Sequence, residues 1–402
     1  MNQNYHQSDC PVCGSSQWDI FFEMSGVPVF CNVLWPERSE AKNCNRGDLK
    51  LAFCSNCGFI GNTAFDPDRL DYSQAYENAL DFSPRFQSYA KSLASRLVEQ
   101  YDLHHKTVLE IGCGKGEFLL SLCQSGENQA IGFDPTYVPL EEHAWADGKI
   151  EFVRDYYSEK YADYQGDFIC CRHTLEHIPQ PTKLLHTLHH NIQGCDDTNI
   201  FFEVPNALDT FSRSAIWDII YEHCCYFSPV SLSYAFSSCG FRVEQVTEAF
   251  QRQFLCLEAS LGETVKTLTE EQKEETQQLL QDIEQFTERF ERTLKIWHEK
   301  LEKWSQNLQK VVLWGAGSKG VTFLNFLKID SSAESPIQYV VDINPRKQGM
   351  YIAGTGQKII SPEFLKEYQP DVVIVMNPIY KDEIQQMLTD LEVENCVLED
   401  GF

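Results

Sequence analysis

The sequence predicts an α/β fold in which a cysteine-rich N-terminal domain precedes two Rossmann-like domains. Short apolar segments alternate with helical patterns over residues 106–262 and again over 310–402, which is typical of parallel sheets. Each of these two regions has a glycine-rich turn directly after an early apolar segment. Residues 8–75 carry spaced cysteines and little helical periodicity, so we expect a separate small domain there.

The composition limits the classes of function. The chain has 402 residues and a formal net charge of -26. A surface this acidic repels phosphate backbones, so nucleic acid is excluded as the main partner, although the acidity by itself could simply serve solubility. No run approaches about 18 apolar residues, and Met1–Asp9 lacks a secretory core, so we expect no membrane association and a cytoplasmic location.

Two C-x-x-C pairs in the N-terminal region predict a metal site. The pairs are Cys10 with Cys13 and Cys54 with Cys57, and each is followed by glycine. Two such turns supply the four thiolates of a closed tetrahedral Zn²⁺ site, whose role is structural. The alternative is that the pairs are unrelated and one of them is redox-active.

The segment Val108–Gly116 predicts a nucleotide-cofactor site. An apolar strand ends at Glu110 and runs directly into Gly112, Gly114 and Gly116, which let the backbone turn sharply and approach a ligand. The next strand ends about 20 residues later at Asp134, where an acid can accept hydrogen bonds from both ribose hydroxyls. Taken alone, these features also suit NAD.

Further segments favour S-adenosylmethionine (SAM), because the chain resembles the class I SAM-dependent methyltransferases. The pattern E-x-G-x-G-x-G is similar to their first motif. By this resemblance Asp155 lies near the adenine, and Arg172 and His173 line the cofactor after the fourth strand. The late pair of strands, within residues 241–258, is similar to their closing antiparallel hairpin.

The aromatic loop Ile220–Ser228 carries the best candidates for proton transfer. It contains Tyr221, Glu222 and His223, and a carboxylate beside an imidazole can fix its tautomer and raise its basicity. The loop follows an apolar strand that we expect to end at the carboxyl edge of the sheet, where sites in open α/β sheets form. A histidine here could equally be structural.

Over nearly its whole length the chain resembles the sugar C-methyltransferases, which act on nucleotide-linked ketosugars. The C-terminal segments Leu313–Gly320, Val341–Gly349 and Pro370–Ile374 are especially similar. The resemblance implies a zinc-binding domain (1–75), a class I methyltransferase Rossmann-like domain (76–262), a helical linker (263–309) and a Rossmann-like substrate-binding domain (310–402).

The resemblance also implies a mechanism and its residues. A base removes a proton beside the sugar ketone, and the enolate attacks the methyl group of SAM. This role is transferred to Glu222 and His223, while Tyr76 and His177 are expected to line the substrate. A methyltransferase for another small metabolite, acting at oxygen, nitrogen or carbon, and a SAM-binding scaffold without catalysis are the alternatives.

Three departures from the family pattern lie near the expected acceptor. Tyr221 directly precedes Glu222, whereas the family tyrosine stands two residues before the glutamate. Phe250–Phe254 replaces a Gly-Gly-Ser element, and Asn377–Tyr380 replaces a Trp-Asn pair. These changes concern the substrate rather than methyl transfer.

The second glycine-rich motif, Gly315–Gly320, has Asp342 about 20 residues downstream and is itself a dinucleotide fingerprint. It could bind NAD in an oxidoreductase half, hold a substrate phosphate near Lys319, or be purely structural.

The linker contains apolar residues at alternating spacings of three and four, as on one helix face. They are Ile283, Phe286, Phe290, Leu294, Trp297, Leu301, Trp304 and Leu308. The face predicts either a dimerising coiled coil or a connecting helix packed on its own domains, so the protein is expected to be a monomer or a homodimer.

Overall fold

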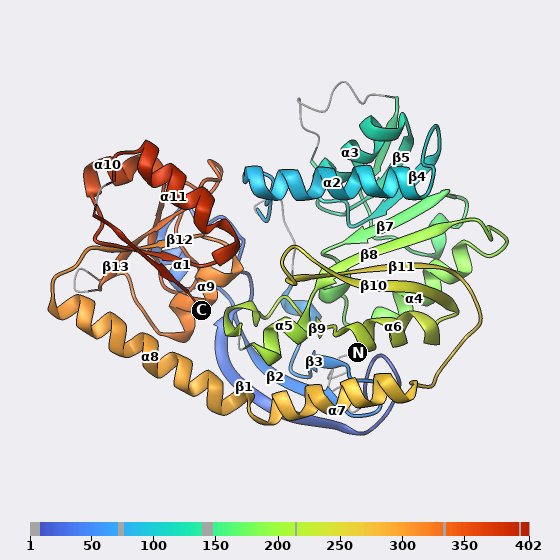
Figure 1. Cartoon of the computed structure of the whole chain (residues 1–402), viewed down its shortest axis with the longest axis horizontal. Coiled ribbons are helices and arrows are strands. Elements are labelled where there is room, and N and C mark those ends of the chain that lie inside the picture. Colours follow the sequence, from blue (N-terminus) through green and yellow to red (C-terminus); the bar gives the residue numbers. More distant parts are fainter. Residues whose placement is uncertain are drawn as a thin grey trace.

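The computed structural model describes residues 9–70, 76–138, 148–213, 215–332, 335–393 and 395–401. The polar segment Met1–Asp9 therefore lies, except for Asp9, outside the described residues. Three sheets with covering helices make up the described chain, and they confirm the predicted α/β fold (Figure 1).

The N-terminal domain is a small antiparallel sheet. Its strands are β1 (Trp18–Pro28), β2 (Arg46–Cys54) and β3 (Ile60–Asn62), and α1 (Arg38–Lys42) lies between the first two in sequence. A fourth strand, β9 (Cys225–Tyr226), pairs with β3 although it is more than 160 residues away in sequence. The loop that carries Glu222 and His223 is thereby joined to the N-terminal sheet.

The middle domain has a seven-stranded sheet of order β10-β11-β8-β7-β4-β5-β6. Its strands are β4 (Thr107–Ile111), β5 (Gln129–Phe133), β6 (Ile150–Val153), β7 (Phe168–Arg172), β8 (Asn199–Pro205), β10 (Phe241–Ala249) and β11 (Phe254–Leu261). The first five are parallel, and the β10–β11 hairpin closes the sheet antiparallel to β8. This order is that of the class I methyltransferase fold, as the sequence predicted.

Helices cover both faces of this sheet (Figure 1). They are α2 (Pro84–Gln100), α3 (Glu117–Gly126), α4 (Pro181–Asn191), α5 (Ala207–Ser212) and α6 (Pro229–Ser238). The side chain of Ser83 caps α2 by accepting a hydrogen bond from the Phe86 amide. Phe86, Leu93 and Leu97 are buried, and their spacing places them on one face of α2.

The C-terminal domain is a five-stranded parallel sheet of order β14-β13-β12-β15-β16, so the second Rossmann-like domain is confirmed. Its strands are β12 (Val311–Trp314), β13 (Ile337–Val341), β14 (Lys358–Ile360), β15 (Val372–Val375) and β16 (Val397–Asp400). Its helices are α9 (Ser318–Phe326), α10 (Leu365–Tyr368) and α11 (Lys381–Asp390). Short 3₁₀ turns occur at Pro67–Arg69, Glu159–Tyr161, Leu175–His177, Ile216–Asp218, Pro362–Phe364 and Pro378–Tyr380.

The linker forms two helices, α7 (Glu270–Glu284) and α8 (Phe286–Gln306), that run beneath the other domains (Figure 1). Its apolar face packs on its own chain: the ring centroid of Phe286 lies 5.5 Å from that of Phe22, and that of Trp297 lies 4.9 Å from that of Phe323. This packing favours connecting helices over a dimerising coiled coil.

The prediction of this apolar face is wrong for one residue, Leu308. Leu308 is 89% exposed, because α8 ends at Gln306 and the backbone turns to a φ of 56° at Leu308. Among the described residues, no helix combines the length and the apolar character needed to cross a membrane.

Candidate active site

A cavity of about 660 Å³ lies at the carboxyl ends of β4, β5 and β7, where class I methyltransferases are expected to bind their cofactor. Most of the predicted cofactor residues line it, namely Glu110, Gly112, Gly114, Asp134, Asp155, Arg172 and His173. Gly116 does not line the cavity. It has a φ of 91°, and a Cβ there would stand 2.7 Å from the Phe152 ring.

The glycine loop is packed against its surroundings and tied to the next strand. Gly112 has a φ of 72°, and a Cβ on it would lie 2.1 Å from the Thr174 hydroxyl. The Gly114 amide donates a 2.9 Å hydrogen bond to Asp134 Oδ2, and the Thr136 amide donates one of 2.8 Å to Asp134 Oδ1. Asp134 therefore fixes the loop as well as lining the cavity.

Two other acids of the cavity differ in environment. Burial raises the pKa of Glu110 to about 8, and among the described residues its Oε2 has no hydrogen-bond partner. An orphaned oxygen of this kind fits a ligand that donates a hydrogen bond. Asp155 is partly exposed and accepts a 2.6 Å hydrogen bond from the Tyr161 hydroxyl.

Glu203, for which the sequence predicted no role, holds Arg172 at the end of β7 and His173 directly after it. It is fully buried, receives the Arg172 guanidinium at 3.0 and 3.3 Å, and lies 2.9 Å from His173 Nε2. Burial raises the pKa of Glu203, but the charge of Arg172 outweighs it and lowers that pKa to about 2. The sequence signal for Glu203 is its charge, because it stands inside the otherwise apolar segment Phe201–Pro205.

A second cavity, of about 340 Å³, lies between the middle and C-terminal domains. Its lining includes the catalytic candidates Tyr76, His177 and His223. Tyr76 and His177 also line the cofactor cavity, as does His173. The two cavities therefore adjoin at these side chains, and we call the second one the acceptor cavity.

The histidines at this junction are held in fixed positions. His177 Nδ1 lies 3.0 Å from the backbone oxygen of Glu222, and the ring centroids of His177 and His223 are 5.0 Å apart. Because a carbonyl oxygen only accepts, Nδ1 of His177 carries a proton. Burial lowers the pKa of His177 to about 4 and that of His223 well below its usual value, so both imidazoles are neutral near pH 7.

Glu222 stands behind the wall of the acceptor cavity. It is fully buried, its Oε2 accepts a 2.7 Å hydrogen bond from the Cys31 amide, and the side chain of Tyr76 lies against its carboxyl group. Burial raises the pKa of Glu222 to about 7. Glu222 therefore reaches the cavity through Tyr76.

Tyr221 is not brought to the cavity. Its hydroxyl accepts a 2.9 Å hydrogen bond from the Asp66 amide, and its ring packs on Phe65 at 5.4 Å between centroids. The side chain points into the N-terminal domain because its loop leads directly into β9, which pairs with that sheet. The expected place of Tyr221 beside the acceptor is thus corrected to a contact between domains.

Two of the family departures meet across the acceptor cavity. The side-chain amides of Gln253 and Asn377 donate to each other at 2.9 Å in both directions. Gln253 ends a turn in which Phe250, Gln251 and Arg252 all have positive φ, between 47° and 72°. Three successive non-glycine residues in this conformation are costly, and such strain is common at ligand sites.

The second glycine motif makes one polar contact within the C-terminal domain and one with the middle domain. Gly315 has a φ of 115°, and the Ala316 amide donates a 2.8 Å hydrogen bond to Asp342 Oδ2. The ammonium of Lys319 pairs with the carboxylate of Asp218. The loop therefore contributes one wall of the acceptor cavity.

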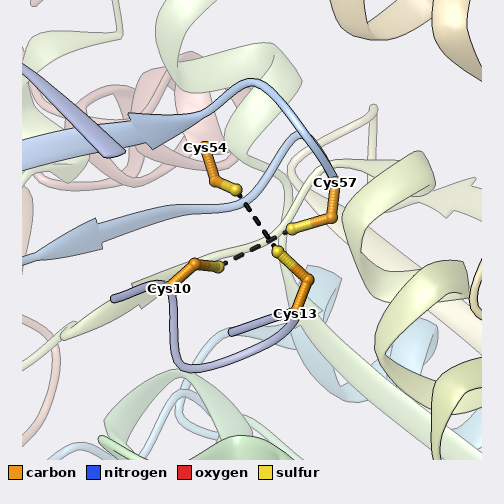
Figure 2. A group of neighbouring side chains, drawn as sticks. All are labelled: Cys10, Cys13, Cys54 and Cys57. Atoms are coloured by element: carbon orange, nitrogen blue, oxygen red, sulfur yellow. Dashed lines mark hydrogen bonds between the residues drawn. The ribbon is translucent and has the colours of Figure 1, made fainter. Parts of the chain in front are cut away.

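The four predicted metal ligands converge on one point (Figure 2). Their sulfur atoms all lie within 4.8 Å of one another, with Cys10 and Cys57 at 3.7 Å and Cys13 and Cys54 at 3.5 Å. Sulfur atoms on a zinc tetrahedron with bonds of about 2.3 Å are separated by about 3.8 Å. The donor set and its spacing therefore fit a Zn²⁺ ion.

Comparisons with known proteins agree with this architecture. A family model described as a methyltransferase domain matches residues 84–246, and one described as a C-methyltransferase C-terminal domain matches residues 252–396. Each model matches less than half of the chain, so residues 84–246 are similar to a methyltransferase domain and residues 252–396 to the C-terminal domain of C-methyltransferases.

Individual curated relatives match about a quarter of the chain. The ubiquinone biosynthesis O-methyltransferase of Yersinia enterocolitica is 31% identical over 108 residues, which is 25% of this chain and 43% of that protein. The same-named protein of Escherichia coli is 30% identical over 110 residues, covering 26% and 45%. The chain thus spans less than half the length of these curated relatives.

Solved structures match a larger part of the chain, at lower sequence identity. The 1,6-didemethyltoxoflavin-N1-methyltransferase of Burkholderia thailandensis has 15% identity and a TM-score of 0.35, over 45% of this chain and 82% of its own. The magnesium protoporphyrin IX methyltransferase of Synechocystis PCC 6803 has 16% identity and a TM-score of 0.35, over 44% and 84%.

Proposed function

We propose that the protein is a SAM-dependent C-methyltransferase that acts on a nucleotide-linked ketosugar. The observation that carries the proposal is the junction of the two cavities, which Tyr76 and His177 line from both sides. When bound, SAM supplies an electrophilic methyl group on a sulfonium centre. Glu110, the glycine loop, Asp134 and Asp155 would hold it, and the acceptor would lie beyond Tyr76.

Proton removal is assigned to His223. A carbon beside a ketone becomes nucleophilic only after it loses a proton, whereas many oxygen or nitrogen acceptors need little more than positioning. His223 lines the acceptor cavity and is neutral near pH 7, so its ring can accept that proton. The neighbouring His177 is a second candidate on the same wall.

Tyr76 is assigned to the enolate oxygen. The Tyr76 side chain lines both cavities. When the Glu222 carboxyl group carries a proton, it can donate to the Tyr76 hydroxyl, and the Tyr76 proton is then available for a hydrogen bond to the charge that develops on the acceptor. Glu222 lies against Tyr76 and positions it from the buried side, so Glu222 acts through Tyr76 rather than on the acceptor.

The nucleotide of the acceptor is assigned to the C-terminal domain. Lys319 and Lys347 both line the acceptor cavity, and the second glycine loop leads into the first turn of α9. Cations next to a helix N-terminus favour a phosphate group. Five acidic residues also line this cavity, and one of them, Asp218, already pairs with Lys319, so a phosphate group would have to take Lys319 from that pair.

The cysteine cluster is proposed to hold one structural Zn²⁺. A site with four thiolates leaves no position for water or substrate, so the ion would hold the N-terminal turns together. A cytoplasmic location agrees with this, because thiols stay reduced there.

The proposal is tested by calorimetric titration with S-adenosylhomocysteine (SAH), and then with thymidine diphosphate on the loaded protein. Binding of SAH followed by the nucleotide is the expected result, and ketosugar turnover with analysis of the methylated atom then completes the test. Binding of SAH alone would shift the assignment to another small-metabolite acceptor. Absence of SAH binding by folded protein would overturn methyl transfer itself.

A further inference from the structure

The residue after Tyr76 connects the two cavities by a buried charge. Glu77 has a side chain that is only 4% exposed. One of its carboxylate oxygens, Oε2, receives Lys115 Nζ at 2.5 Å and Arg346 Nη1 at 3.4 Å. The other, Oε1, accepts a hydrogen bond from Asn344 Nδ2 at 3.2 Å.

These partners belong to the two loops that bind ligands in the proposed function. Lys115 stands between Gly114 and Gly116 in the cofactor loop and lines the cofactor cavity. Asn344 and Arg346 follow β13 in the C-terminal domain, and Asn344 lines the acceptor cavity.

The connection continues to the second glycine loop. The Asn344 amide donates a 2.8 Å hydrogen bond to Asp342 Oδ1, and Asp342 Oδ2 accepts from the Ala316 amide at 2.8 Å. The Glu77 amide in turn donates a 2.8 Å hydrogen bond to the Asn32 backbone oxygen in the N-terminal domain. Glu77 thus connects all three domains: its carboxylate joins the middle and C-terminal domains, and its amide contacts the N-terminal domain.

A buried carboxylate is stable only while its cationic and hydrogen-bonding partners surround it, because removal of one partner leaves charge that water cannot reach. Burial raises the pKa of Glu77, but Lys115 and the C-terminal partners outweigh it and the net pKa is lowered. The position of the cofactor loop therefore depends on the C-terminal domain being docked.

We infer that Glu77 is a positioning residue that couples the cofactor loop to the acceptor wall of the C-terminal domain, so that SAM and acceptor bind cooperatively. This inference rests on the proposed SAM site. It predicts that a change on the C-terminal domain alters affinity for a ligand in the other cavity. Arg346 is suited to this test because it does not line the cofactor cavity.

The experiment is a double-mutant cycle read as SAH affinity by calorimetry on the full chain. We expect Glu77→Gln and Arg346→Gln each to weaken SAH binding by about five- to tenfold, the lower part of the usual range for coupled sites. In the Glu77→Gln background, Arg346→Gln should have no further effect, because the charge it balances is gone. Arg346→Lys keeps that charge and should retain most of the affinity.

Glu383→Gln is the matched control. Glu383 also bridges the two domains, but it accepts from the Ser83 hydroxyl and the Arg85 amide and does not touch the cofactor loop. Its substitution should leave SAH affinity unchanged. Equal effects of Arg346→Gln with and without Glu77, or no effect of Arg346→Gln, would overturn the coupling.

Two further outcomes are distinguishable. If wild-type protein binds no SAH, the proposed function fails and not the coupling alone. If Glu77→Gln does not fold, the comparison of Arg346→Gln with Arg346→Lys still decides, because that side chain is 36% exposed and tolerates substitution better.

Discussion

His223 is where the proposed chemistry depends most on a single side chain. It lines the acceptor cavity, 5.0 Å from His177 between ring centroids, and burial keeps both rings neutral. A neutral imidazole can accept a proton without first losing one. The same burial makes the ring a weaker base, so the acceptor's carbon acid must be activated by a donor such as Tyr76.

We predict that His223→Ala lowers methyl transfer to a ketosugar by about two to four orders of magnitude, the usual contribution of a general base. SAH affinity should change little, since His223 is not among the residues that line the cofactor cavity. Turnover with radiolabelled SAM measures the first quantity and calorimetry the second. His190→Ala, on the exposed side of α4, is the control. Unchanged turnover in His223→Ala would remove it as the base.

Glu176 makes the stability of the unliganded protein depend on pH. Burial raises its folded pKa to about 8 from 4.5, so its contribution to stability is present below pH 4.5 and is lost as pH rises through 8. We predict that the free energy of unfolding of the wild-type protein falls between pH 5.5 and 8.5. In Glu176→Gln this fall should be smaller, by on the order of a few kcal/mol, because glutamine has no proton to lose.

Urea unfolding at the two pH values measures this difference, with the exposed Glu263→Gln as the control. Parallel pH profiles for wild type and Glu176→Gln would show that the carboxyl group ionises normally in the fold.

At the scale of elements, the apolar face of the linker had two possible partners. The spacing of its apolar residues predicts a helix, but it does not predict whether that face packs within the chain or against a second chain. In the structure α7 and α8 cover the N-terminal sheet and α9, and Trp297 is 2% exposed. The face is therefore used within the chain, and the helices fasten the C-terminal domain to the rest.

We predict that Trp297→Ala lowers the free energy of unfolding by about 3–5 kcal/mol, because it leaves a cavity between α8 and α9. Leu308→Ala, from the same predicted face but 89% exposed, should change it by less than about 0.5 kcal/mol. Denaturant titration of both variants provides the measurement. Equal losses would mean that Leu308 is covered in solution, as in a dimer.

At the scale of the whole molecule, the site is assembled from all three domains. The N-terminal sheet holds the Glu222–His223 loop through the pairing of β3 with β9, the middle domain supplies the cofactor cavity, and the C-terminal domain closes the acceptor cavity. Substitution of a cysteine in the cluster should therefore lower methyl transfer, although no cysteine of the cluster lines either cavity.

We predict that Cys54→Ser reduces bound zinc from about one ion per chain and lowers methyl transfer, while SAH affinity stays within a few-fold of wild type. Metal analysis, turnover and calorimetry on the same preparation check the three parts. Cys195→Ser, at a half-buried cysteine outside the cluster, is the control. Full activity in zinc-free, folded protein would show that the ion does not support the loop.

The sequence alone determined the local features of this protein. Gly112 and Gly114 require positive φ, the C-x-x-C pairs make tight turns, and the apolar periods of α2 and the central strands follow from short-range geometry. Such features depend on neighbours within a few residues, so a pattern is enough to predict them. The two Rossmann-like domains followed from them, as did most residues of the cofactor cavity.

Only the tertiary structure decided which distant side chains meet. Tyr221 contacts Asp66, and Glu203 binds both Arg172 and His173. Glu77 links Lys115 to Asn344, which lies more than 200 residues away in sequence. In each case a buried polar group found its partner across an interface between elements or domains. The free energy of burying such a group depends on that partner, and no local pattern encodes it.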